Sequence, residues 1–152
     1  MTRLLVVDSS VIRSAGETDH RVSSSCRACL EKIRLICHRV ATTADLQDEW
    51  RRHMSRFSRK WRRSMCARKK PLQVINPTCV PLDGIGLTEG DQRAIEKDRC
   101  LLEAALSADR VIVTRDRSLQ VALAKTRRGK HVMEQITWID PVDDGAAAIE
   151  GL

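Results

Sequence analysis

Five short apolar runs are separated by longer segments of helical periodicity, and this alternation continues along the whole chain. The first run, Leu4–Val7, is continuous rather than alternating, which is typical of a strand buried on both faces. The five strands are predicted at residues 3–7, 38–42, 72–75, 110–114 and within 132–139. Strands alternating with helices predict a parallel sheet with helices on both faces, which is a three-layer α/β/α sandwich.

Helices are predicted where apolar residues recur every three or four positions and a capping residue precedes them. Ser9 or Ser10 is expected to cap a short helix, and Thr43 a long one over residues 44–67. The remaining helices are predicted over residues 22–37, from a Thr88–Asp91 capping box to about 107, from Ser118 to about 125, and over 145–149.

The segment 44–67 carries a single apolar stripe, so we expect one long amphipathic helix whose stripe packs on the core. Its other faces consist of Arg, Lys and Ser. The stripe consists of Leu46, Trp50, Met54, Phe57, Trp61 and Met65.

The chain of 152 residues is the length of one domain, and 42% apolar residues are enough for a hydrophobic core. No apolar run approaches the roughly 20 residues of a membrane helix. The N-terminal apolar run stops at Asp8, which is too early for a signal peptide. We therefore expect a cytoplasmic protein with a single domain over residues 1–152.

The formal charge of +7 is concentrated in one segment. Residues 50–82 hold ten Lys and Arg and no acid, while the rest of the chain has a net charge of −3. Such a segment indicates a polyanionic partner, either a nucleic acid or an acidic protein surface. The candidate contacts are Arg51, Arg52, Arg56, Arg59, Lys60, Arg62 and Arg63.

A zinc site is one interpretation of the motif Cys26-x-x-Cys29 with the later pair Cys37-His38. The alternative, that these cysteines are buried core residues, is favoured, because they lie at three- and four-residue spacing on the apolar face of the helix 22–37. One Cys pair supplies only half of a tetrahedral zinc site.

Acidic residues occupy the places where an α/β sheet binds ligands. Asp8 directly follows the first strand, and Asp116 follows the strand 110–114 with one residue between. Asp98 lies on the apolar face of its helix, where a carboxylate needs an ion pair or a cation. Glu49 is a fourth candidate, although Asp45 and Asp48 are close to it in the sequence. Clustered carboxylates without His or Cys favour Mg²⁺ or Mn²⁺.

Two segments resemble motifs of the PIN-domain family. Val6-Val7-Asp8-Ser9-Ser10 is similar to its first-strand motif, and the stretch from Asp98 to Thr114-Arg115-Asp116 is similar to its second half, with the spacing of VapC-type toxins. The resemblance implies a metal-dependent ribonuclease whose Mg²⁺ or Mn²⁺ ligands are Asp8, Glu49, Asp98 and Asp116. Ser10 and Thr114 would orient ligands or water.

The resemblance also implies an antitoxin partner and a possible homodimer. Many relatives carry a further acid where this chain has Ser118, which favours a second hypothesis, a non-catalytic RNA-binding or assembly module of the same fold. Phosphatases of the haloacid dehalogenase type need a second Asp where this chain has Ser10. A phospho-receiver domain would need a Lys after a later strand, which we do not find.

Overall fold

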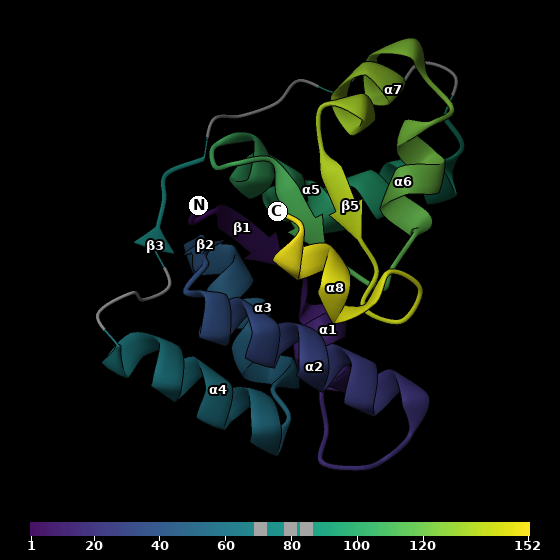
Figure 1. Cartoon of the computed structure of the whole chain (residues 1–152). Coiled ribbons are helices and arrows are strands. Elements are labelled where there is room, and N and C mark those ends of the chain that lie inside the picture. The colour runs from purple at the N-terminus through teal and green to yellow at the C-terminus, as the bar shows by residue number, and fades with distance from the viewer. Residues whose placement is uncertain (69–72, 78–81, 83–86) are drawn as a thin grey trace.

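A single parallel sheet runs through the middle of the molecule (Figure 1). The computed structural model describes residues 1–68, 73–77, 82 and 87–152. The strands are β1 (Leu4–Val7), β2 (Arg39–Thr42), β3 (Gln73–Val74), β4 (Val111–Val113) and β5 (Thr137–Ile139). Their order is β3-β2-β1-β4-β5, and every neighbouring pair is parallel. The predicted α/β class with a central parallel sheet is confirmed.

Helices connect the strands and cover the sheet. Within the described residues they are α1 (Ser9–Ser14), α2 (Arg21–Ile36), α3 (Ala44–His53), α4 (Arg56–Ala67), α5 (Glu89–Leu106), α6 (Ser118–Leu123), α7 (Arg127–Glu134) and α8 (Gly145–Glu150). The predicted capping box at the start of α5 is present, with Thr88 and Asp91 bonded reciprocally.

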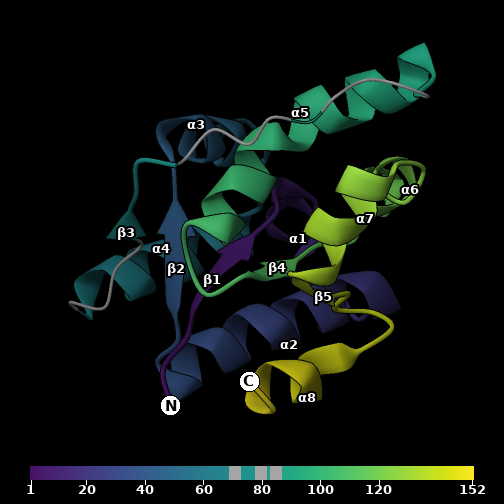
Figure 2. The ribbon, with the colours of Figure 1, turned by 90° about the horizontal axis from the view of Figure 1, so that it is seen from above.

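The helices form two layers on opposite faces of the sheet (Figure 2). One face packs against α1, α2, α4 and α8, and the other against α5, α6 and α7, while α3 contributes to both. Leu5 and Val7 of β1 point into the first layer, and Val6 points into the second. Both faces of β1 are therefore buried, which explains why its sequence is continuously apolar.

The long helix predicted over 44–67 is wrong, because the chain breaks into α3 and α4 at Met54 and Ser55. Thr43 does cap α3, accepting the Leu46 amide at 3.2 Å. The Ser55 hydroxyl accepts the Ser58 amide at 3.0 Å and donates to the Ala15 carbonyl at the end of α1. A long-range bond thus places a second helix cap inside a continuous helical pattern.

Replacing the cap of α4 should destabilise the fold. We expect Ser55→Ala to lower the free energy of unfolding by about 1–2 kcal/mol, because the cap and the bond to Ala15 are both lost. Urea denaturation followed by circular dichroism measures this. Ser64→Ala, a matched change inside α4, should have an effect near zero, and equal losses in both variants would contradict the role of Ser55.

The apolar stripe of 44–67 packs on the core as predicted, although two helices carry it. Trp50 and Trp61 are buried, and their rings lie 6.1 Å apart across the break. The Trp61 indole donates to the Leu30 carbonyl of α2 at 2.7 Å. Packing on α2 therefore keeps α4 against the core although the chain bends between α3 and α4.

Three local predictions need correction. Asp8, not Ser9 or Ser10, is the N-cap residue of α1, and Arg117, not Ser118, is that of α6. Helix α7 was not predicted, and the last strand lies at the end of the predicted segment 132–139, at Thr137–Ile139. Gly129 concealed α7, since glycine disfavours helices, but a Cβ there would lie 2.2 Å from the Leu123 carbonyl oxygen.

The interpretation of Cys26 and Cys29 as core residues is supported by the structure. Both are fully buried on α2, and burial raises the pKa of their thiols to about 11 and about 12. The His38 ring is also occupied, because Nδ1 accepts the Arg3 amide at 3.0 Å and Nε2 lies 3.2 Å from the Ile149 carbonyl oxygen.

The loop predicted over 76–86 lies largely outside the described residues. In the described parts of the chain, no helix has the length and apolar character to cross a membrane.

Candidate active site

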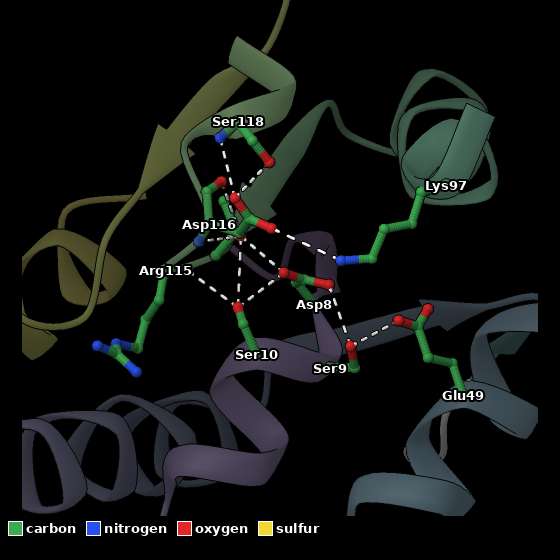
Figure 3. Close-up of polar contacts among 9 residues, drawn as sticks. Asp8, Ser9, Ser10, Glu49, Lys97, Arg115, Asp116 and Ser118 are labelled. Carbon is green, nitrogen blue, oxygen red and sulfur yellow. Dashed lines mark hydrogen bonds and ion pairs between the residues drawn. The ribbon is translucent and has the colours of Figure 1, made fainter. Parts of the chain in front are cut away.

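The sheet reverses its strand order between β1 and β4, and ligands bind at the carboxyl ends of strands at such a point. Asp8 follows β1 directly, and its amide donates to the Val113 carbonyl of β4 at 2.9 Å. Thr114 follows β4, so residues distant in sequence meet at one edge (Figure 3). The sequence prediction that Asp8 and Asp116 share a rim is confirmed by this geometry.

The two predicted supporting residues hold Asp8 directly. Ser10 Oγ donates to Asp8 Oδ2 at 2.7 Å, and Thr114 Oγ1 donates to the same oxygen at 2.8 Å. The Arg115 amide donates to Ser10 Oγ at 3.1 Å, which connects α1 to the loop after β4. Because both hydroxyls use Oδ2, Asp8 Oδ1 remains for a ligand apart from a 3.5 Å contact with Ser9.

Ser9 was not among the predicted site residues, yet it joins two of the acids. Its hydroxyl donates to Glu49 Oε1 at 2.8 Å and lies 3.5 Å from Asp8 Oδ1. Glu49 is therefore the helix acid that reaches the rim. Asp45 and Asp48 line a neighbouring cavity instead, and Asp48 pairs with Arg51 at 3.0 Å.

Asp116 is held by Ser118, the residue two positions after it. The amide of Ser118 donates to Asp116 Oδ1 at 2.9 Å, and the Ser118 hydroxyl donates to the same oxygen. Burial works to raise the pKa of Asp116, but these bonds outweigh it and hold the pKa below its usual value. The other oxygen, Oδ2, faces the Lys97 ammonium at 4.0 Å, so Asp116 remains ionised at neutral pH.

Asp98 is the acid of the site whose negative charge is least offset by nearby donors and cations. Its side chain is buried, with 6% exposed, and among the described residues it makes no hydrogen bond or ion pair. Burial and the negative charge of Asp8 raise its pKa to about 7, and Lys97 only partly offsets them. The predicted position of Asp98 on the apolar face of α5 is confirmed, and the salt bridge considered as an alternative is not formed within the described chain.

The four acids line one cavity of about 100 Å³, which we name the four-carboxylate cavity. Three basic side chains line it as well, Arg13, His53 and Lys97, and sequence reasoning missed them. The signals were present, because Arg13 lies four residues after Ser9 and His53 four residues after Glu49. Arg13 and His53 therefore each share a helix face with a residue of the site, whereas Lys97 directly precedes Asp98.

The donor set suits a hard cation, since it consists of carboxylate oxygens at the edge of a parallel sheet. Among the described residues, however, no three Asp, Glu, His or Cys side chains are already gathered into a group that could hold a metal ion. Carboxylates repel one another without a cation. The arrangement is thus a cavity with four acids on its walls, and their final approach would depend on an ion.

The predicted basic contacts separate into two groups at the helix break. Arg51 and Arg52 lie on α3, where Arg51 is paired with Asp48 and Arg52 lines the neighbouring cavity of about 500 Å³. The other five lie on α4, and they are Arg56, Arg59, Lys60, Arg62 and Arg63.

Comparison of the chain with protein-family models, with curated proteins and with solved structures finds no match.

Proposed function

We propose that this protein is a metal-dependent ribonuclease that hydrolyses RNA phosphodiester bonds. One observation carries the proposal: Asp98 is buried, has no hydrogen-bond or ion-pair partner among the described residues, and lines a cavity that it shares with Asp8, Glu49 and Asp116. Burying an unpaired carboxylate costs several kcal/mol, unless a proton or a cation compensates it. Four carboxylates at the switch point of a parallel sheet, one of them without a partner in the described chain, favour a bound Mg²⁺ or Mn²⁺.

The side chains around the cavity have separate roles in this proposal. Asp8, Glu49, Asp98 and Asp116 hold the ion, which when bound would activate water and offset the charge of the phosphodiester. Ser10 and Thr114 fix the orientation of Asp8 through their bonds to Oδ2.

Basic side chains at the cavity provide the complementary function of receiving the substrate. Arg13, His53 and Lys97 line it and carry the donors that a phosphate needs. Lys97 also offsets the charge of Asp116, from which it lies 4.0 Å away.

RNA as substrate, and a role as the toxin of a toxin–antitoxin pair, are the more specific parts of the proposal. They are supported by the resemblance of residues 6–10 and 98–116 to PIN-domain motifs and by the basic segment 50–82. An antitoxin and a homodimer are the protein partners that this resemblance suggests.

The test is RNA cleavage by the wild type and by Asp8→Asn, with Mg²⁺ or Mn²⁺ and with EDTA. We expect metal-dependent cleavage by the wild type and a rate at least about 100-fold lower for Asp8→Asn, because a ligand charge is lost while the side-chain shape is kept. Cleavage rates under single-turnover conditions measure the effect.

Asp19→Asn is the matched control, since it makes the same chemical change at an exposed position. It should cleave RNA like the wild type. Equal cleavage by wild type and Asp8→Asn, or no cleavage by either, would contradict the proposed nuclease.

The second candidate is a non-catalytic RNA-binding module of the same fold. It is favoured by Ser118, whose hydroxyl and amide occupy Asp116 Oδ1 where an additional acid would supply ligands. RNA binding in EDTA without turnover in Mn²⁺ would support this candidate. A specific calorimetric Mn²⁺ signal that Asp98→Asn abolishes would count against it.

A further inference from the structure

The outer face of α4 presents a row of cations. Arg56, Arg59, Lys60 and Arg63 are exposed and lie at spacings of three and four residues, so they share one side of the helix. The opposite side, with Trp61 and Met65, is buried against the core. We call the four exposed cations the α4 basic stripe.

The α4 basic stripe differs from the other charged helices in having almost no partners. Arginines on α2, α3 and α5 pair with acids one turn away, as Arg34 does with Glu31 and Arg51 with Asp48. Helix α4 contains no acid, and in the described chain the ion pairs of the stripe are limited to Lys60 with Glu17 at 3.5 Å. The stripe is therefore available to an external anion.

The stripe begins beside the four-carboxylate cavity. His53 lines that cavity, and Arg56 follows three residues later, within about 10 Å along the backbone. The bond from Ser55 to the Ala15 carbonyl anchors the start of α4 to the end of α1, whose first turn holds Asp8. Figure 1 shows α4 on the outside of the fold next to α2. The cavity-lining His53 thus lies three residues before the stripe, and the end of α1, which carries Arg13, is bonded to the start of α4.

The composition of the stripe favours phosphates over a protein surface. Protein interfaces combine charges with exposed aromatic and aliphatic side chains at their centre. The large apolar residues exposed in the described chain are Met1, Leu35 and Val121, none of which lies on α4. A row of Arg and Lys without exposed large apolar neighbours in the described chain matches the contacts that proteins make with a nucleic-acid backbone.

We propose that the α4 basic stripe binds the phosphate backbone of a single-stranded RNA that leaves the four-carboxylate cavity, an inference that rests on RNA being the ligand of the proposed function. From Arg56 to Arg63 the helix rises about 10 Å, which spans about three phosphate-to-phosphate steps, and therefore four phosphates, of one stacked strand. The cavity of about 100 Å³ admits a phosphodiester but not a duplex. Without exposed aromatic residues, the contact does not depend on base sequence.

The test measures RNA binding in EDTA, where no metal-dependent cleavage occurs. Fluorescence anisotropy compares labelled oligouridylate, a mixed-sequence strand and a duplex over a series of salt concentrations. For the wild type we expect a slope of log affinity against log salt of about −3 on both single strands, given four phosphate contacts. The triple variant Arg56→Gln, Arg59→Gln, Arg63→Gln should bind RNA at least about tenfold more weakly at low salt. The magnitude of its salt slope should be smaller by about 2.

The matched control removes three exposed charges elsewhere, in Arg21→Gln, Arg127→Gln, Lys130→Gln. We expect it to bind RNA nearly as the wild type does, and both variants to keep the wild-type circular dichroism. Equal losses in the two variants would overturn the inference, because net charge rather than α4 would then determine binding. Unchanged RNA binding by the α4 variant would also overturn it and would indicate an acidic protein as the occupant of the stripe.

Failure of this inference and failure of the proposed function give different results. A wild type that cleaves RNA while the α4 variant binds RNA normally retains the function and loses the inference. A wild type that binds RNA through α4 but never cleaves it with Mg²⁺ or Mn²⁺ retains the inference and loses the function.

Discussion

Asp98→Asn is expected to make the metal-free protein more stable at pH 8 and, at the same time, to remove its stabilisation by Mn²⁺. Burial and the charge of Asp8 raise the pKa of Asp98 from its ordinary 3.8 to about 7. Ionising this group in the folded state at pH 8 therefore costs about 4 kcal/mol. An unpaired buried amide recovers only part of that cost, so we expect a net gain of about 2 kcal/mol in the free energy of unfolding.

The pH dependence has a defined sign. Between pH 4 and 7 the folded protein retains a proton on Asp98 that the unfolded chain has released, so the wild type loses stability as the pH rises. Asp98→Asn lacks this dependence. The gain should therefore be small at pH 4 and should grow up to about pH 7 to 8, as measured by urea denaturation in EDTA.

Adding Mn²⁺ should reverse the order of stability of the wild type and Asp98→Asn. An ion that binds the folded state at 100 times its dissociation constant stabilises it by about 2.7 kcal/mol. Mn²⁺ should raise the melting temperature of the wild type and leave that of Asp98→Asn nearly unchanged. Asp19→Asn should follow the wild type in both conditions. Equal Mn²⁺ effects in all three proteins would show that the ion acts elsewhere.

Trp50→Ala is expected to cost about 3–5 kcal/mol of unfolding free energy, the largest stability loss that we predict. Trp50 is 1% exposed, contacts Trp61, and donates through its indole N–H to the Val7 carbonyl at 3.0 Å. Its removal leaves a large cavity between α3, α4 and the sheet. Trp138→Ala is the control, because that ring is only partly buried on β5 and its loss should cost less.

Trp50 also connects two acids of the site, since it follows Glu49 in sequence and bonds the residue before Asp8. Trp50→Phe keeps most of the volume but removes the bond to Val7, at a cost of about 1–2 kcal/mol. We expect its Mn²⁺ affinity to fall, as measured by calorimetry.

A smaller stability loss in Trp50→Ala than in Trp138→Ala would contradict the central packing role of Trp50.

The layered α/β fold was predictable because its main determinants are local or periodic. The apolar run Leu4–Val7 indicated a strand buried on both faces, and Asp98 stood out because it interrupts an apolar helix face. Asp8 and Asp116 follow strands, so a parallel sheet had to bring them to one edge. These features depend on residue type and spacing alone.

Other features depend on partners that are distant in sequence. The break between α3 and α4 follows from the bond of Ser55 to Ala15, which lies 40 residues away. The choice of Glu49 over Asp48 follows from the hydroxyl of Ser9, also 40 residues away. Helical periodicity continues through both places, because it reports only which side of the chain is apolar.

The sequence by itself determined the parallel α/β class, the identity of the four acids as candidates, and the presence of a basic segment. Only the tertiary structure decided that these acids line one cavity with Arg13, His53 and Lys97. It also decided that the basic segment breaks into two helices, the second of which begins three residues after His53. The physical reason is that propensity and periodicity act over a few residues, whereas a site is assembled by hydrogen bonds and packing between elements far apart in the chain.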